Sequence, residues 1–347
     1  MARQRSIAVR KAILSGVFWR SSSPVRRVAQ EFKLTPQAVQ LHVRSLVKSG
    51  DLIAHGQRRY RRYELSPRRN DERHYELAPN LSEDLVWDTF VNPFVADLDD
   101  AVRDICHYGL TEMVNNVIDH SDASQLRVQL RLTTASLWIR VTDNGIGMFQ
   151  KIANALQLAD PRQALLELSK GKFTTDPSRH TGEGVFFTSR AFDSFSIRSS
   201  ELLFAHSTRS DDWLVEMEEK TFVGTRISMG IILPAQRKLE EVFARFSSGP
   251  DDHRFAKTHV PLKLATYGDE SLVSRSSAKR VLSRVERFDE VLLDFLGVRS
   301  VGQGFADEIF RVFTSAHPKI RIIWINANEQ VTGMIRRAEA AKNQSVQ

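Results

Sequence analysis

The 347-residue sequence contains a single cysteine, Cys106, and no long apolar run. One thiol cannot form an intramolecular disulfide, and it excludes a zinc site built from clustered cysteines. No segment approaches the ~18 consecutive apolar residues of a membrane-spanning helix. The N-terminus is basic but lacks the apolar core of a secretory signal, so we expect a cytoplasmic protein without membrane contact.

Acidic residues are scarce in the first 70 positions. Sixteen Lys and Arg residues stand there against three acids (Glu31, Asp51 and Glu64), a net charge of +13. The remaining positions hold 33 basic and 39 acidic residues, a net charge of −6, within an overall charge of +7. This asymmetry is typical of a nucleic-acid-binding module joined to ordinary globular domains. A solvated basic tail is the alternative, but the region is patterned.

The basic segment has the pattern of three helices and a hairpin. Apolar residues recur at helical spacing over residues 7–14. Ser23-Pro24 and Thr35-Pro36 each combine a capping residue with a proline, the pattern of a helix start. Gly50 ends the third helix, and residues 51–65 predict a basic hairpin.

This arrangement resembles a winged helix-turn-helix domain over residues 1–66. The resemblance implies that the third helix enters the major groove of double-stranded DNA. Arginines near the hairpin tip would contact phosphates, which contributes affinity and salt dependence rather than sequence choice. Winged helices also mediate protein contacts, so that role is the alternative. The candidate DNA-binding residues are Gln37, Gln40, Leu41, Arg44, Arg58, Arg59 and Arg61.

A polar linker and a long helix are predicted after the hairpin. Residues 67–79 lack apolar periodicity, which indicates a linker, whereas residues 99–121 show a helical pattern. At 100° per residue, Asn116 falls about 40° and Asp119 about −20° from Glu112, and the apolar residues fall on another side. The helix therefore presents two carboxylates and an amide on one face. A solvated polar face is the alternative interpretation.

Two glycine-containing segments follow this helix. Alternating apolar residues predict strands over 126–132 and 137–141, and the second runs into Asp143-Asn-Gly145-Ile-Gly147. Glycines there let the backbone approach a flat ligand, and the aspartate can accept a hydrogen bond from an exocyclic amine. Thr181-Gly182-Glu-Gly184 then opens a helix, whose first N–H groups suit phosphate. Residues 148–180 look like a lid, with the basic side chains Lys151, Lys170, Lys172, Arg179 and His180.

In order and spacing these segments resemble the GHKL ATPase superfamily, which includes gyrase, Hsp90, MutL and histidine-kinase catalytic domains. Glu112-x-x-x-Asn116 resembles the N box, Asp143-x-Gly145-x-Gly147 the G1 box, and Gly182-x-Gly184 the G2 box. Gly224-Thr225 matches the later Gly-Thr pair. The resemblance spans residues 80–235 and implies a Bergerat-type α/β sandwich with a mixed sheet under helices.

The same resemblance implies ATP and Mg²⁺ as ligands. Asn116 would coordinate the metal that bridges the phosphates, and Asp143 would bind adenine. Thr225 would reach the adenine side or a phosphate, and Glu112 would act as general base beside the metal. The other nucleotide-binding candidates are Asp119, Gly145, Gly147, Gly182 and Gly184. No His-Glu-x-x-x-Pro helix precedes this part, so a self-phosphorylating histidine kinase is not expected.

The last part of the chain alternates strands and helices. Residues 236–254 predict a linker helix and loop, and residues 255–341 a small α/β domain. The segments Val291-Leu-Leu-Asp294-Phe-x-Gly297 and Gly304-Phe-Ala-Asp307 resemble the STAS-like domain found beside GHKL ATPases in bacterial regulators. Antagonists of anti-sigma factors carry a phosphorylated serine after this strand. This chain has Gly302-Gln-Gly304 there, with Ser300 upstream, which favours a binding or autoregulatory role.

The predicted fold class is therefore multidomain α+β, and the predicted function is a bacterial regulator. ATP and Mg²⁺ in the GHKL domain would control contacts to double-stranded DNA and to the STAS-like domain, which could also bind a protein partner. A homodimer would match the paired half-sites that such modules often read. The alternatives are an ATPase or anti-sigma-type serine/threonine kinase acting on its own STAS-like domain or on a partner, and a non-hydrolysing ATP sensor.

Overall fold

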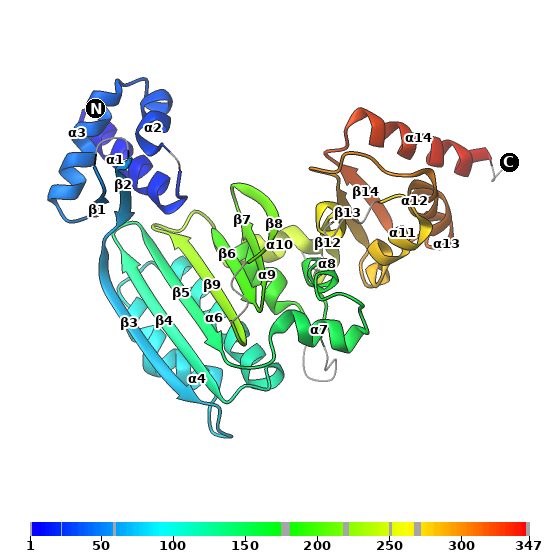
Figure 1. Ribbon diagram of the computed structural model, residues 1–347, viewed down its shortest axis with the longest axis horizontal. Helices are drawn as coiled ribbons and strands as arrows, with labels where there is room; N and C mark the ends of the chain where they lie inside the picture. The colour runs from blue at the N-terminus through cyan, green and yellow to red at the C-terminus, as the bar shows by residue number, and fades with distance from the viewer. Residues whose placement is uncertain are drawn as a thin grey trace.

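The computed structural model describes residues 2–21, 23–57, 60–174, 181–217, 222–249, 252–266 and 272–344. Three parts follow one another along the chain: a helical N-terminal module, a large sheet with helices on one face, and a smaller α/β part (Figure 1). Among the described residues, no helix is both long and apolar enough to cross a membrane.

The N-terminal module consists of three helices and a two-stranded antiparallel hairpin. The first helix is longer at both ends than residues 7–14, where the apolar pattern lies. The Thr35 hydroxyl accepts the Ala38 N–H at 3.2 Å and so caps the third helix, as its sequence predicted. The elements are α1 (Ala2–Phe18), α2 (Pro24–Phe32), α3 (Pro36–Lys48), β1 (Leu52–His55) and β2 (Arg62–Leu65).

Seven strands form the large sheet, and every neighbouring pair in it is antiparallel. The resemblance predicted a mixed sheet in this part of the chain; the parallel strand pairs of the structure lie in the separate three-stranded sheet of the C-terminal part. In spatial order the strands are β3 (Pro67–Glu76), β4 (Gln125–Thr133), β5 (Ser136–Asp143), β9 (Thr225–Ile232), β6 (Ser194–Ser199), β7 (Leu202–Ser207) and β8 (Ser210–Glu216).

Strand β3 corrects the linker predicted over residues 67–79. It pairs with β4 from Pro67 opposite Thr133 to Glu76 opposite Gln125. β3 is an edge strand with nearly all of its side chains exposed, so backbone hydrogen bonds hold it in place without an alternating apolar face. Because β2 runs almost directly into β3, the N-terminal module is joined to the sheet by a paired strand instead of a flexible linker.

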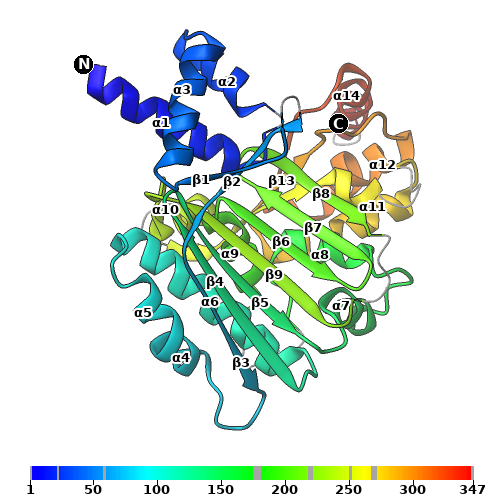
Figure 2. The ribbon, with the colours of Figure 1, turned by 60° about the vertical axis from the view of Figure 1, so that its left-hand side comes forward.

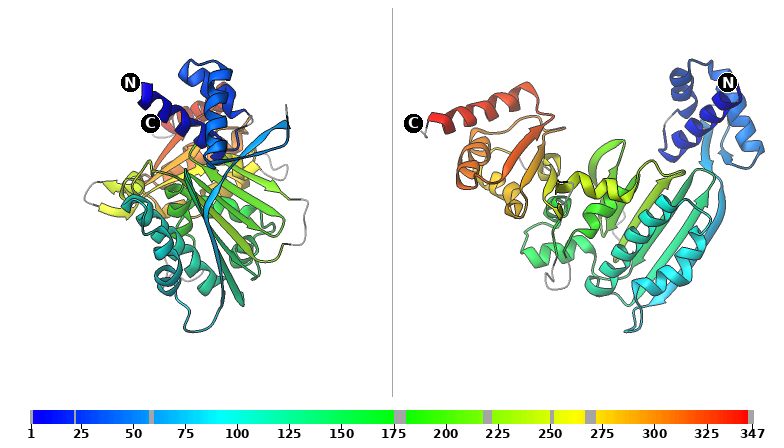
Figure 3. Two further views of the ribbon diagram at one scale, coloured as in Figure 1. Left: turned by 90° about the vertical axis from the view of Figure 1, so that its left-hand side faces the viewer. Right: turned by 180° about the vertical axis from the view of Figure 1, so that it is seen from behind.

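Helices cover one face of the large sheet (Figure 3, right). Alternate residues of β4 and β5, such as Leu130 and Ile139, face this layer and are fully buried. The covering elements include α4 (Glu83–Val86), the π-helical turn η2 (Trp87–Val91), α5 (Asn92–Val95), α6 (Asp100–His120), α9 (Gly184–Ala191) and α10 (Leu239–Phe246). Two further helices, α7 (Met148–Leu156) and α8 (Gln163–Lys170), lie between β5 and β6 along the chain.

The C-terminal part is built on a three-stranded parallel sheet in the order β12-β13-β14. The short hairpin β10 (Ser247–Gly249) and β11 (Asp252–Phe255) precedes it, where a loop was predicted. The strands are β12 (Lys257–Pro261), β13 (Glu290–Asp294) and β14 (Arg321–Ile325). The helical elements are η3 (Leu262–Thr266), α11 (Arg275–Leu282), η4 (Val285–Arg287), α12 (Gln303–Asp307), the π-helical η5 (Glu308–Phe313), α13 (Thr314–Ala316) and α14 (Glu329–Gln344).

The large sheet domain and the C-terminal part share one apolar core. Phe255 of β11 stands at the junction, with its ring centroid 4.5 Å from that of Phe186 and 4.8 Å from that of Phe187 on α9. Phe288, just before β13, lies 5.1 Å from the same ring. Aromatic contacts therefore pack the two parts directly against each other, and they are not independent domains joined only by a linker.

Candidate functional site

A cavity of about 330 Å³ lies between α6, the start of α7 and the start of α9. This volume is at the lower end of the ~300–1,000 Å³ of small-molecule sites. The cavity brings together most of the residues that the sequence marked far apart. Those lining it are Glu112, Asn116, Asp143, Gly147, Gly182, Gly184 and Thr225, whereas Asp119 and Gly145 do not line it.

The cavity follows one row of side chains along α6. Glu112, Asn116 and His120 are spaced four residues apart, and all three line it. Asp119 is close to Glu112 in angular position but lies beside this row, one turn beyond Asn115. At this end of α6 the cavity is lined by His120 and Ser121, which lie about 100° and 200° round the helix from Asp119, so the structure does not bring Asp119 to the cavity.

The Glu112 carboxylate lies against the first residue of α9. A Cβ added to Gly184 would fall 1.9 Å from Glu112 Oε2, so only glycine fits there with the carboxylate in place. Burial raises the pKa of Glu112, and the carboxylates of Glu183 and Glu83 raise it further. A carboxylate with a raised pKa is a better proton acceptor near neutral pH than an ordinary glutamate.

Asn116 carries an unsatisfied polar atom. Its Nδ2 is buried and has no hydrogen-bond partner among the described residues. Leaving a buried amide unpaired costs about 1–3 kcal/mol, which a bound polar ligand would recover. No cluster of three or more His, Cys, Asp or Glu side chains that could hold a metal occurs in the described ranges. The unpaired N–H group of Nδ2 fits a phosphate oxygen of a ligand. The amide oxygen Oδ1 is the atom of Asn116 that would hold Mg²⁺ together with ligand phosphates, the usual coordination of this ion.

Asp143 ends β5 and is 95% buried, with 5% of its surface exposed. Its Oδ1 accepts the N–H of Gly145 at 2.8 Å and the N–H of Thr225 at 3.2 Å. Burial raises the pKa of Asp143, although these N–H bonds act in the opposite direction. The second oxygen, Oδ2, receives neither backbone bond and is the acceptor that an exocyclic amine would use.

Three predicted binding residues shape the site. The N–H of Gly145 holds the Asp143 carboxylate, and Gly145 itself is outside the cavity lining. Thr225 Oγ1 accepts the N–H of Met148 at 2.9 Å and so ties the start of α7 to β9. Gly147 has φ +91°, a left-handed conformation that suits glycine, at the turn that leads into α7.

The apolar wall of the cavity was not identified from the sequence. It comes from Met148, Ile152, Leu168 and Ile227, which would contact a flat base. Their spacing is that of ordinary core residues on α7, α8 and β9, so no local signal separates them from packing. Lys151 also lines the cavity, and its Nζ donates to Asp122 Oδ2 at 2.6 Å.

Residues 102–194, which include the Glu112 row, Asp143 and both loop glycines, match the family model described as histidine kinase-, DNA gyrase B- and HSP90-like ATPase. An ATPase domain of the GHKL kind is present. Residues 277–332 match the model of a STAS-like domain of unknown function, so a STAS-like domain is present as well. A search of curated proteins found no match to the chain. Thr225 and Lys170 illustrate the limits of these matches: Thr225 lies beyond the GHKL match, and Lys170 lies within it but faces the STAS-like domain.

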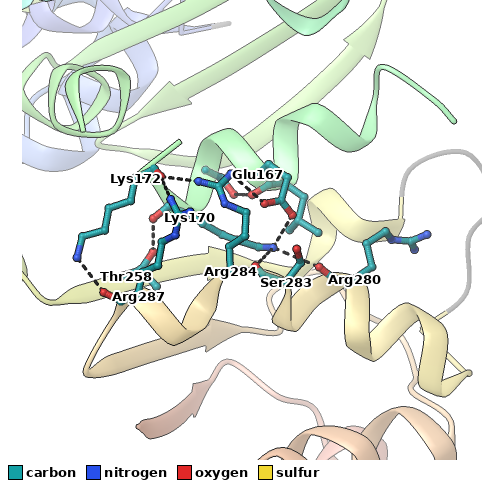
Figure 4. A network of polar contacts seen from close by, with 10 residues as sticks. Glu167, Lys170, Lys172, Thr258, Arg280, Ser283, Arg284 and Arg287 are labelled. Atoms are coloured by element: carbon teal, nitrogen blue, oxygen red, sulfur yellow. Dashed lines mark hydrogen bonds and ion pairs between the residues drawn. The ribbon is translucent and has the colours of Figure 1, made fainter. Parts of the chain in front are cut away.

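The described part of the predicted lid, residues 148–174 (below, the lid segment), is bound to the STAS-like side of the molecule. Lys170 at the end of α8 is 1% exposed. Its Nζ donates to Glu167 Oε1 at 2.7 Å, to the Ser283 carbonyl at 2.9 Å and to the Arg280 carbonyl at 3.2 Å (Figure 4). The Thr258 hydroxyl of β12 donates to the Lys170 carbonyl at 2.6 Å. Lys170 therefore joins α8 to β12 and to the end of α11.

Lys172 extends this attachment. Its Nζ donates to the Arg287 carbonyl at 2.8 Å, and its own carbonyl accepts from the Arg287 and Arg284 guanidinium groups (Figure 4). The predicted lid cations Lys170 and Lys172 thus bind the C-terminal part. Arg179 and His180 lie outside the described residues.

The other side of the same short segment faces the cavity. Leu168, Phe173 and Thr174 line it, and the Phe173 N–H donates to the Gly182 carbonyl at 3.2 Å. Residues 167–174 therefore contact the candidate nucleotide site and the STAS-like side at once.

Proposed function

We propose that the chain is an ATP- and Mg²⁺-binding regulator that couples the nucleotide state of its GHKL domain to its STAS-like domain and to DNA. The observation that carries the proposal is the double contact of residues 167–174. A ligand that displaces Phe173 or Thr174 must strain or rearrange the bonds of Lys170 and Lys172 to the C-terminal part. A nucleotide that binds the two arrangements with different affinity would shift their populations.

The cavity supports a specific set of roles. Asn116 would hold Mg²⁺, which supplies neutralisation of phosphate charge when bound. Asp143 would accept the adenine amine through Oδ2, and the apolar wall would cover the base. Glu112 would accept a proton from water or a hydroxyl, and its raised pKa suits that role.

The N-terminal module is the proposed DNA-binding part, with double-stranded DNA as its partner. Gln37, Leu41 and Arg44 are exposed on α3, where they are free to contact a partner. Gln40 donates to the Tyr63 hydroxyl at 3.0 Å, so it also holds the hairpin against α3. Arg61 is exposed, whereas Arg58 and Arg59 lie outside the described residues. Paired half-sites would call for a homodimer.

Phosphoryl transfer to protein is the second candidate function. The raised pKa of Glu112 favours activation of a hydroxyl, and Ser300 is exposed in the loop that follows β13 of the STAS-like domain. An anti-sigma-type serine/threonine kinase would use such a pair, with the acceptor on its own STAS-like domain or on a partner.

One experiment separates these functions. ATP turnover is measured on the full chain with and without duplex DNA, and the same samples are examined for phosphoprotein. A DNA-dependent change in phosphate release without incorporation supports the coupled ATPase. Incorporation that Glu112→Gln abolishes supports the kinase. If DNA neither binds nor alters nucleotide affinity or turnover, the proposed coupling to DNA is wrong.

A further inference from the structure

The face of the large sheet opposite the helices is strongly basic. Figure 2 shows the strands β4, β5 and β9 of this face side by side. The register of these neighbouring strands places Arg127 and Arg131 of β4, Arg140 of β5 and Arg226 of β9 on the same face. Thr142 pairs with both Arg127 and Arg226, so these two arginines are two strands, about 10 Å, apart. Arg140 lies two residues, about 7 Å, along β5 from Thr142.

Two of these four arginines, Arg140 and Arg226, lack matching negative charge among the described residues, whereas Arg127 lies 3.8 Å from Glu72 and Arg131 lies 2.6 Å from Glu64. Arg140 donates to the Ser228 hydroxyl at 3.4 Å and to Gln129 Oε1 at 3.3 Å, both neutral groups. Within the described ranges, neither Arg140 nor Arg226 forms an ion pair with a carboxylate, and the Nε of Arg226 is buried without a hydrogen-bond partner. Burial lowers the pKa of Arg140 and Arg226, and the charges of neighbouring arginines lower both further. The fold therefore holds a repulsive cationic surface that an anion would relieve.

The basic face opens into a cleft that it shares with the N-terminal module. The cleft has a volume of about 1770 Å³, larger than the ~1,000 Å³ limit of common small-molecule sites. Gln40 and Arg44 of α3 line it together with Arg140 and Ser228 of the sheet. Its arginines are Arg20, Arg44, Arg61, Arg62, Arg131 and Arg140. The single acid in its lining, Glu64, already pairs with Arg131 at 2.6 Å.

We propose that this sheet face is a second phosphate-binding surface for duplex DNA, with Arg140 and Arg226 as its contacts. The inference rests on the proposed DNA binding by the N-terminal module, because a duplex on α3 would lie in the same cleft. Guanidinium groups suit this role, since their forked donors match phosphate oxygens. The tryptophan of this face, Trp138, is stacked on Phe18 of α1 with 5.3 Å between ring centroids, so it is engaged in holding the module to the sheet. The groups that this face presents are thus suited to contacts with the phosphates of DNA and not to stacking on its bases.

The surface also adjoins the nucleotide cavity through the sheet. Thr142 and Arg226 lie on the basic face of the sheet, next to the part that lines the cleft, whereas their chain neighbours Asp143 and Thr225 line the cavity on the opposite face. Phosphates held by Arg226 would therefore act on the same two strand ends that position Asp143, whose Oδ1 accepts the Thr225 N–H.

The test compares a double variant with a matched control in the full chain. Arg140→Gln with Arg226→Gln removes two charges from the sheet face. Arg336→Gln with Arg337→Gln removes two exposed charges from α14, away from the cleft. The probe is a fluorescein-labelled random-sequence duplex of about 30 base pairs, roughly three helical turns. Its affinity is measured between roughly 50 and 200 mM salt, and the single-stranded form is measured in parallel.

We expect the slope of log affinity against log salt to fall by about 1.8 in the sheet variant, about 0.9 for each lost phosphate contact. The control should keep the wild-type slope. The unfolding temperature of the sheet variant should not fall, because the substitution relieves mutual repulsion. A wild-type slope in the sheet variant would overturn the inference, as would tighter binding to the single strand.

Arg44→Gln on α3 separates this inference from the proposed function. If Arg44→Gln weakens duplex binding but the sheet variant does not, the N-terminal module binds DNA alone and only the sheet surface is wrong. If the wild-type chain binds no duplex at all, the proposed DNA binding fails, and the sheet surface fails with it.

Discussion

The Glu112 carboxylate fills the position that a side chain at Gly184 would need: a Cβ on Gly184 would lie 1.9 Å from the carboxylate oxygen Oε2. Because the first residue of α9 abuts the candidate base, the start of that helix fixes where the carboxylate sits. The motif glycine is therefore a direct determinant of the geometry of Glu112, in addition to any contact with phosphate.

Gly184→Ala should consequently impair chemistry through Glu112. The added methyl group must displace the carboxylate, and we expect ATP turnover to fall by about 10²-fold or more, the contribution of a positioned general base. Gly333→Ala is the matched control, since Gly333 lies exposed in α14 with no atom near its Cβ position. That change should leave turnover intact and stabilise the helix by up to about 1 kcal/mol. Equal turnover in both variants would show that Glu112 does not depend on Gly184.

The pH dependence of turnover should report the raised pKa of Glu112. A general base works only when deprotonated, so activity should fall as pH drops through this pKa, at a higher pH than for an ordinary glutamate. Glu183→Gln removes a carboxylate that raises the pKa, and the acid limb should move to lower pH. Glu240→Gln, an exposed acid on α10, should not move it. An unshifted limb in Glu183→Gln would contradict the assignment.

The same pKa direction predicts the stability of Glu112→Gln. A carboxyl group whose pKa is higher in the folded than in the unfolded state favours folding below the unfolded value, and this advantage is lost as pH rises through the folded value. Burial disfavours the ionised carboxylate that Glu112 carries at neutral pH in the folded protein. Glu112→Gln should therefore abolish turnover without lowering the unfolding temperature. A large loss of stability would indicate a structural role for this side chain.

Lys170→Met should release the lid segment from the C-terminal part. The change leaves Glu167 buried beside Arg284 at 3.6 Å and the Ser283 and Arg280 carbonyls without their donor. Breaking such a buried pair costs about 3–5 kcal/mol. Limited proteolysis between the two parts should become faster, and added ATP should no longer change its rate. Lys279→Met, at an exposed position of α11, should behave as wild type; the same behaviour in Lys170→Met would refute the coupling.

Most of the residues that line the cavity could be predicted because their motifs are local. Glu112 and Asn116 are one helical turn apart, and Asp143 is held by the N–H of Gly145 two residues away. The attachment of the lid segment to the C-terminal part could not be predicted from the sequence. The hydrogen-bond partners of Lys170, the Arg280 and Ser283 carbonyls, lie more than 100 positions later in the chain. A buried lysine on an amphipathic helix has the same local pattern as an exposed one.

Two other predictions from the sequence, for residues 67–79 and for Asp119, differ from the structure for physical reasons. Strand β3 was missed because an edge strand with exposed side chains needs only backbone pairing with β4. Asp119 was assigned to the pocket from its angle on α6, but the cavity follows the row of Glu112, Asn116 and His120. At that end of α6 the cavity faces His120 and Ser121, which lie about 100° and 200° round the helix from Asp119.

The most direct test of the account is calorimetric titration of ATP with Mg²⁺ into wild-type and Asp143→Asn protein. The amide keeps an oxygen for the Gly145 and Thr225 N–H groups but presents a donor where the adenine amine needs an acceptor. Asp97→Asn, at an exposed position, is the control. We predict affinity at least about tenfold weaker in Asp143→Asn, a loss of about 1–3 kcal/mol, with no fall in the unfolding temperature without nucleotide. Equal affinity in all three proteins would contradict the assignment of this cavity to ATP.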